Sequence, residues 1–139
     1  MSNIESMKGW YPGVVKSYDQ ATRLCRVEIP GITDGGDVYP LAEILYPIGD
    51  KSRAGANSTE IEILPGDTVW IEFIGGDSRY PIITGYRNPQ AGNSADWRRF
   101  HHANVELIAD NEFRITVGAS SIVVTPTGVT ITADRIDLN

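Results

Sequence analysis

The last 29 residues of the chain, NEFRITVGASSIVVTPTGVTITADRIDLN (Asn111 to Asn139), decide how its C-terminal part folds. Apolar and polar residues alternate here in short runs, which is the pattern of β-strands that bury one face. Turn-forming residues separate the runs, among them Gly118-Ala119 and Pro126-Thr127. The sequence therefore predicts a ladder of very short strands, with an apolar face that must be buried against something.

The strand-and-turn units of this ladder recur at short intervals. Phe113 and Ile122 are nine residues apart, and Ile122, Val129 and Ile136 follow one another in steps of seven. A short repeat of strand and turn is typical of a β-helix or β-prism. The predicted inward positions, which form the trimer core, are Val105, Leu107, Phe113, Ile115, Val117, Ile122, Val124, Val129, Ile131, Ile136 and Leu138. The predicted outward positions are Arg114, Thr116, Thr130, Thr132 and Asp137.

The ladder is too small to be stable alone. A ribbon of about 35 residues buries too little apolar surface to offset its loss of chain entropy, and domains below about 40 residues usually need oligomerisation or another support. Each inward side chain contributes roughly 1.5–3 kcal/mol, but only when it is buried. A flat sheet would also leave its edge strands open to aggregation. We therefore predict that three chains entwine around a common axis, as a homotrimer.

Residues 10 to 86 predict a five-stranded barrel. The candidate strands are residues 10–19, 23–31, 37–47, 66–77 and 79–86. Within the third, Pro40 interrupts the pattern, and residues 40 to 46 could instead form a turn of helix. Residues 48 to 59 have the composition of a long exposed loop. The side chains expected to fill the core are Val69, Trp70, Ile71, Phe73, Ile82 and Ile83.

These patterns give an all-β chain in three parts: a barrel in residues 1–89, a linker or neck in residues 90–102, and a trimeric prism in residues 103–139. The composition agrees, since 14 Gly and 8 Pro are scattered between short Val, Ile and Thr runs. No apolar stretch approaches the ~18 residues of a membrane-spanning helix. No secretory signal is visible at the N-terminus, so we expect synthesis in the cytoplasm.

The charge balance argues against nucleic acid as a partner. The net charge is −6, and residues 1–89 contain 8 Lys and Arg against 12 Asp and Glu. Proteins that bind nucleic acid usually present a basic face. The one basic cluster is Arg98-Arg99, between Trp97 and Phe100. We expect the two aromatic rings to pack at the neck while the arginines pair with nearby carboxylates.

The histidine pair His101-His102 is the weak candidate for a metal site. Adjacent residues of a strand point to opposite faces, so at most one histidine per chain could reach a threefold axis. Three such histidines could hold an ion, but no second set of ligands is evident. We therefore expect no metal and no cofactor.

Nothing in the sequence predicts catalysis, so we expect a protein that is not an enzyme. The carboxylate pairs Glu60/Glu62 and Asp134/Asp137 have no pocket-forming context. The single cysteine, Cys25, lies in a strand pattern and is expected to be a small buried residue. One cysteine also excludes a disulfide within the chain.

The N-terminal part resembles the oligosaccharide/oligonucleotide-binding (OB) barrel of the central spike proteins of contractile-tailed phages, which also occurs in type VI secretion spikes. The matching stretches are, in order, PGVV (12–15), CRVEIPG (25–31), LPGDTVWIEF (64–73) and GGDSRYPIITGYRNP (75–89). Each alone is a weak turn signal, whereas four in this order and spacing are fairly specific. The ladder of short strands occupies the place of the family's β-prism.

The resemblance implies a structural virion protein of the tail baseplate. In that family the barrels form a collar under the tail hub, and the prism punctures the host outer membrane when the sheath contracts. The lysozyme domain of some members and the fused hub of type VI spikes have no counterpart here. The His-x-His motif that binds iron at the apex of several short spikes is also missing, so an ion on the axis lacks those ligands. The end of the prism is either blunt or covered by a small tip protein of the PAAR-repeat kind.

The alternative is a binding module, in which the barrel grips nucleic acid or a glycan and the C-terminal part only trimerises it. A nucleic-acid-binding OB barrel is expected to show aromatic residues among basic ones on its binding face. The acidic balance of residues 1–89 points the other way.

Overall fold

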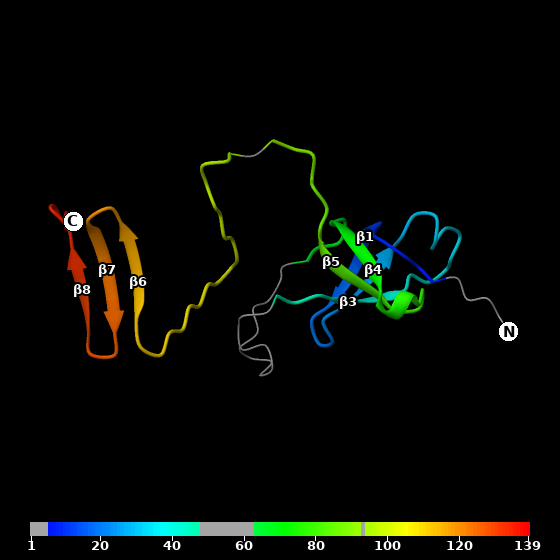
Figure 1. Cartoon of the computed structure of the whole chain (residues 1–139), viewed down its shortest axis with the longest axis horizontal. Helices are drawn as coiled ribbons and strands as arrows, with labels where there is room; N and C mark the ends of the chain where they lie inside the picture. Colours follow the sequence, from blue (N-terminus) through cyan, green and yellow to red (C-terminus); the bar gives the residue numbers. More distant parts are fainter. Residues whose placement is uncertain (1–5, 48–62, 93) are drawn as a thin grey trace. The chain divides into compact units, whose positions relative to one another are not determined.

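The structure is a computed structural model of the whole chain, and it describes residues 6–47, 63–92 and 94–139. The described residues form an all-β protein, with a closed five-stranded barrel and a separate three-stranded sheet. These belong to two compact units, Met1–Arg98 and Arg99–Asn139. In Figure 1 the strands of the first unit are coloured from blue to green, and those of the second from yellow to red.

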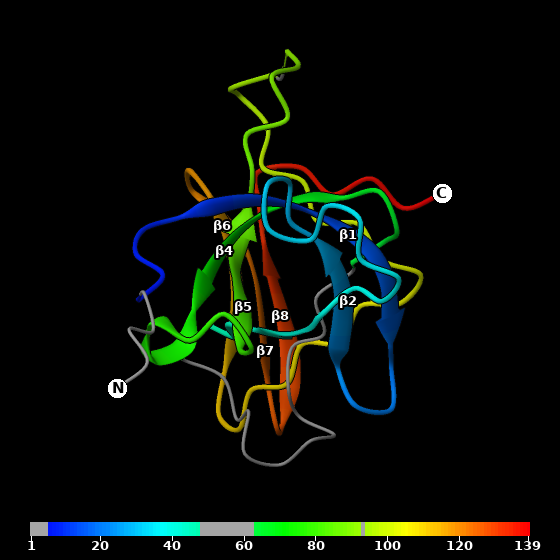
Figure 2. The same cartoon turned by 90° about the vertical axis from the view of Figure 1, so that its right-hand side faces the viewer.

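The barrel confirms the five strands expected from the sequence. They are β1 (Tyr11–Asp19), β2 (Leu24–Glu28), β3 (Leu41–Ile44), β4 (Thr68–Phe73) and β5 (Pro81–Tyr86). Their order around the barrel is β1-β2-β3-β5-β4, and only the pairing of β3 with β5 is parallel. The long strand β1 pairs with β4 through its first part and with β2 through the rest, so it closes the barrel (Figure 2).

The possible helical turn at residues 40 to 46 is wrong, because Leu41–Ile44 is the strand β3. It pairs with β2 on one side and β5 on the other, and both partners supply a hydrogen-bond ladder that a helical turn would lose. A short 3-10 helix, η2 (Ile74–Gly76), connects β4 to β5. The predicted loop at residues 48 to 59 lies outside the described residues.

Side chains that alternate along the strands fill the barrel. The buried apolar residues are Val15, Cys25, Val27, Ile29, Ala42, Ile44, Ile63, Val69, Ile71, Phe73 and Ile83. Trp70 and Ile82 were expected in this core, but they lie on the outer face because they alternate with buried neighbours. Gly13 is explained by close packing, since a Cβ at this position would overlap the side chain of Ile71.

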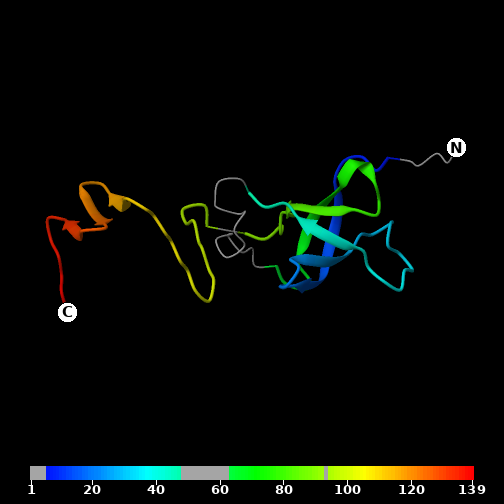
Figure 3. The same cartoon turned by 90° about the horizontal axis from the view of Figure 1, so that it is seen from below.

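The second unit contains β6 (Phe113–Val117), β7 (Ser120–Thr125) and β8 (Gly128–Thr132), paired as an antiparallel meander. The strands form a single layer (Figure 3). The predicted ladder also included the segments around Val105/Leu107 and Ile136/Leu138, but the structure has no strand there. Neither segment has a strand to pair with among the described residues.

Both turns of the meander are tight. Val117 pairs with Ser120 across Gly118-Ala119, and Thr125 pairs with Gly128 across Pro126-Thr127. Gly118 has a φ of 56°, and the residue after it does not share the positive φ. That combination matches a type II′ hairpin turn, which favours glycine at its first central position.

Candidate functional site

The apolar face of the three-stranded sheet is the main candidate site, and the pairing register defines it. Phe113, Val124 and Val129 lie opposite one another across the three strands and form one row. Ile115, Ile122 and Ile131 form a second row, two residues along each strand. Since side chains two apart in a strand share a face, all six point to the same side. Hereafter these six residues are called the apolar face.

The apolar face is largely open to solvent in the single chain. The exposed fractions run from 38% for Ile122 and Val124 to 63% for Val129. Phe113, Ile115 and Ile131 lie between these limits, and no described residue of this unit is classed as buried. Single exposed apolar side chains are ordinary on protein surfaces, whereas a contiguous apolar patch is typical of an interaction site. The face therefore has the character of an interface without its partner.

The opposite face of the sheet is polar. Arg114, Val123 and Thr130 form one of its rows, and Thr116, Ser121 and Thr132 form the other. The sequence assigned Arg114, Thr116, Thr130 and Thr132 to the outside, and the register places all four on this one face. Val123 is the single apolar member of the two rows. The sheet thus has one side suited to water and one suited to burial.

Two ion pairs within the chain lie beside the sheet. Arg114 donates to Glu112 at 3.1 Å, and Arg135 donates to Asp137 at 2.9 Å. Exposed pairs of this kind contribute little to stability, roughly 0–1 kcal/mol at most. The apolar face itself carries no ionisable side chain. Copies of this face can therefore meet without placing like charges together.

The structure brings together seven of the eleven residues predicted for the trimer core. Six form the apolar face, and Val117 follows on the same side at the end of β6, 77% exposed. The other four, in the non-strand segments, have exposed fractions of 66% for Val105, 71% for Leu107, 52% for Ile136 and 91% for Leu138.

In the described part of the barrel, four cations lie over aromatic rings. Lys16 lies over Tyr39, Arg23 over Tyr46, Arg79 over Tyr80 and Arg87 over Trp70, at 5.2 to 5.6 Å from the ring centroids. No pattern in the sequence predicted these pairs. For Trp70, alternation with buried Val69 and Ile71 could have indicated its outward position. The pairs Lys16/Tyr39 and Arg23/Tyr46 join segments that lie far apart in the sequence and meet only in the folded barrel. The pair Arg79/Tyr80 depends on the conformation of the turn between β4 and β5.

Two of these cations are also paired with carboxylates. Lys16 lies 2.7 Å from Glu28, and this hydrogen bond raises the pKa of Lys16. Arg79 lies 2.7 Å from Asp77, and its hydrogen bonds lower the pKa of Asp77 to about 2. A cation that already has a carboxylate partner is less available to a phosphate. The barrel pairs are therefore weaker indicators of nucleic-acid binding than their number suggests.

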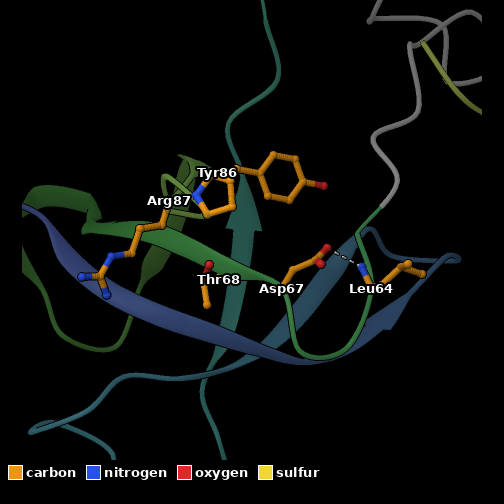
Figure 4. A pocket seen from close by; sticks show the side chains of 6 residues that line it. Leu64, Asp67, Thr68, Tyr86 and Arg87 are labelled. Atoms are coloured by element: carbon orange, nitrogen blue, oxygen red, sulfur yellow. Dashed lines mark hydrogen bonds between the residues drawn. The ribbon is translucent and has the colours of Figure 1, made fainter. Parts of the chain in front are cut away.

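A hollow of about 450 Å³ lies beside β4 and β5. It is lined by Leu64, Asp67, Thr68, Tyr86, Arg87 and Pro89 (Figure 4). The side chains of Tyr86 and Arg87 point in different directions, and the Asp67 carboxylate accepts a hydrogen bond from the Leu64 backbone at 2.8 Å. The described lining of the hollow contains no serine, cysteine or histidine that could form a nucleophile–base pair. The hollow has the features of a surface groove rather than of a catalytic pocket.

A strip of aromatic residues lies on the same outer face. The rings of Trp10 and Trp70 are 6.1 Å apart at 41°, and Trp10 donates its indole N–H to Glu72. Arg87 lies over Trp70 and also lines the hollow. Trp10 is 63% exposed. Arg87 thus links the aromatic strip to the hollow.

The histidine pair lies outside the strands. His101 and His102 are exposed and follow the aromatic residue Phe100, which is 75% exposed, as Trp97 is 67% exposed. In residues 6–47, 63–92 and 94–139, no three His, Cys, Asp or Glu side chains are grouped so as to hold a metal ion. The described ranges also contain no helix with the length and apolar character needed to cross a bilayer.

The remaining predicted positions divide between buried, paired and undescribed residues. Cys25 is fully buried in β2, as expected, and burial raises its pKa to about 11. Asp137 is paired with Arg135, and Asp134 is an exposed residue after β8. The pair Glu60/Glu62 lies outside the described residues.

Comparison with known proteins adds no relative. No model of a known protein family matches the chain, and no curated protein sequence matches it significantly. The residues themselves and the resemblance of their motifs are therefore the basis on which a function can be inferred.

Proposed function

We propose that this chain is the subunit of a homotrimeric central spike, a structural protein of a contractile-tail baseplate that punctures the host outer membrane. The observation that carries the proposal is the apolar face, six aligned side chains that stay 38% to 63% exposed in one chain. Three copies that turn these faces inward bury them together and form the prism of the spike. The proposed role, puncturing the membrane, is mechanical and requires no catalytic group.

The barrel supports the same proposal. Its strand order and its single parallel pairing, between β3 and β5, agree with an OB barrel, and the motifs that resemble the spike family lie in or beside its strands. Gly13 of PGVV lies against Ile71 of LPGDTVWIEF, so two of those motifs meet in the core. We assign this unit to the collar that contacts the tail hub.

Two further partners belong to the proposal. A small tip protein of the PAAR-repeat kind would cover the far end of the prism, and the host outer membrane would be a transient contact. The proposed location is the virion, in the tail baseplate. Neither a cofactor nor nucleic acid has a role in this mechanism.

Solution mass tests the trimer directly. The expected mass is three times 15.2 kDa by light scattering at micromolar concentration. A stable, well-folded species with the mass of one chain would contradict the proposal. Detection of the chain in purified tailed particles tests the virion assignment, since an assembly factor would be absent from them.

A binding module remains the second candidate, and one observation favours it: the aromatic strip Trp10–Trp70 with Arg87, on the outside of the barrel. Stacking on exposed aromatic rings is the usual way in which OB barrels hold single strands. A pull-down with single-stranded DNA at increasing salt separates the two candidates. Salt-sensitive retention that Trp10→Ala removes would favour the binding module, and no retention at low salt would exclude it for DNA.

A further inference from the structure

Both strand pairs of the sheet in the second unit, β6 with β7 and β7 with β8, form within one chain. Five residue pairs join β6 to β7 and five join β7 to β8, with no register shift in either ladder. By contrast, the barrel has such shifts between β1 and β2 and between β4 and β5. An uninterrupted ladder is the arrangement that keeps each apolar row straight across all three strands.

The turns hold the strands of one chain next to each other. Val117 and Ser120 face each other across two residues, and so do Thr125 and Gly128. Adjacent strands lie ~4.8 Å apart, so a two-residue loop reaches only the neighbouring strand. The positive φ of Gly118 and the contact of the Thr125 hydroxyl with the Gly128 carbonyl at 3.4 Å fit these reversals. A chain that wound from face to face around an axis would have to open both turns.

The apolar face has the composition of a surface that meets copies of itself. It has two rows of three side chains, contains no charge, and lies on one side of a single layer. The other side carries threonines, a serine and Arg114, which suit water. A partner with charged groups would have nothing to pair with on this face. Identical faces, in contrast, bury apolar side chains against apolar side chains.

We propose that each chain supplies one complete wall of the prism: β6, β7 and β8 stay paired within their own chain, and two sister copies cover the apolar face of each wall. This inference depends on the homotrimer of the proposed function and specifies how its strands are shared. It replaces an entwined arrangement, in which neighbouring strands come from different chains. The partner of the face is thus a second and third copy of the same sheet.

A pair of cysteines on the polar face distinguishes walls from entwined strands. Arg114 and Val123 are direct neighbours across β6 and β7, and neither belongs to the apolar face. The full-length Arg114→Cys/Val123→Cys chain is purified under reducing conditions, weighed by light scattering and then oxidised with diamide. The single variants Arg114→Cys and Val123→Cys are the controls. Cys25 does not compete, because it is fully buried.

The expected result is a trimer in which the disulfide forms inside each chain. Non-reducing denaturing gels then show only the 15.2 kDa chain, with a mass lower by the two hydrogens lost in the oxidation. Disulfide-linked dimers and trimers from the double variant, absent from the controls, would overturn the walls and leave the trimeric spike in place. If the protein is a trimer but no disulfide forms, the proposal that β6 and β7 of one chain pair with each other would also be contradicted. A mass of one chain in solution would overturn the proposed function itself, and the three-wall packing with it.

Discussion

The two units of this chain differ in how their strands pair and in how far their apolar side chains are buried. The barrel joins strands that are far apart in the sequence, as β1 does with β4, and eleven apolar residues of its described part are buried within one chain. The sheet joins only consecutive strands and leaves its apolar face open. The barrel is closed, whereas the outer edges of β6 and β8 have no strand partner among the described residues, so the two units differ in burial and in edge pairing. The paired strands of the sheet do not by themselves stabilise this unit, because backbone pairing does not replace the burial of apolar side chains. Its exposed apolar face is therefore expected to be one side of an interface.

The largest expected effect comes from a charge on the apolar face. Ile131→Asp would force three carboxylates into an apolar interior, so we expect the trimer to be lost. Thr130→Asp is the matched control, because Thr130 is the neighbouring residue on the polar face. Light scattering should give the mass of one chain for the first variant and an unchanged trimer for the second. The opposite outcome for the two variants would mean that the faces are inverted.

A cavity in the barrel should affect stability without affecting assembly. Ile71 is fully buried, and Ile71→Ala is expected to lower the free energy of unfolding by about 2–5 kcal/mol. The control is Ile82→Ala, because Ile82 lies on the outer face and should show a much smaller loss. Denaturant unfolding measures both, and light scattering should give the same mass for both. Loss of the trimer in Ile71→Ala at native conditions would show that the units are not independent.

The thiol of Cys25 reports on the barrel alone. Because it is buried and its pKa is raised to about 11, alkylation by iodoacetamide at pH 8 should be at least ~100-fold slower than that of an exposed thiol. The rate should stay low in Ile131→Asp, whose change lies in the other unit. Mass spectrometry over time gives the rate. Rapid alkylation in that variant would mean that barrel closure depends on the sheet.

The smallest effect concerns Asp77, in the turn between β4 and β5. Its pKa is lowered from 3.8 to about 2 by hydrogen bonds from Arg79, so the folded state favours the ionised carboxylate. The stabilisation is present above pH 3.8 and is lost as the pH falls toward about 2. Asp77→Asn should therefore flatten the acid limb of the stability curve slightly, since the group is exposed. Thermal unfolding between pH 2 and 5 tests this, and an identical acid limb in both proteins would contradict it.

Features that depend on the local alternation of apolar and polar residues could be predicted from the sequence. The five barrel strands, the tight turns of the sheet and the burial of Cys25 follow from short-range patterns, and the structure confirms them. Trp70 and Ile82 were expected in the core because of their size, but each alternates with buried neighbours and lies on the outer face. In the case of β3, Pro40 obscured a strand of four residues that exists because β2 and β5 lie on either side.

Long-range placement was beyond the sequence. The cation–aromatic pair of Lys16 with Tyr39 joins residues 23 positions apart, and the Trp10–Trp70 contact spans 60. Nothing in their spacing predicts these contacts, since they follow from barrel closure. The segments at Val105/Leu107 and Ile136/Leu138 show the converse: each has a strand pattern but no strand partner in the part of the chain that the structure describes. Alternation predicts the ability to pair, and pairing itself requires a neighbour.

The local connectivity of β6, β7 and β8 has a kinetic consequence. Hairpins closed by two-residue turns form in about 1–10 μs, whereas folds dominated by non-local pairing take milliseconds to seconds. We therefore expect the strands β6, β7 and β8 to pair before the barrel closes, because closure requires the long-range pairing of β1 with β4. Encounter between chains, which depends on their concentration, would then set the rate of trimer formation. Chains refolded at low protein concentration should therefore accumulate with a closed barrel and a C-terminal sheet that has not yet met its sister copies.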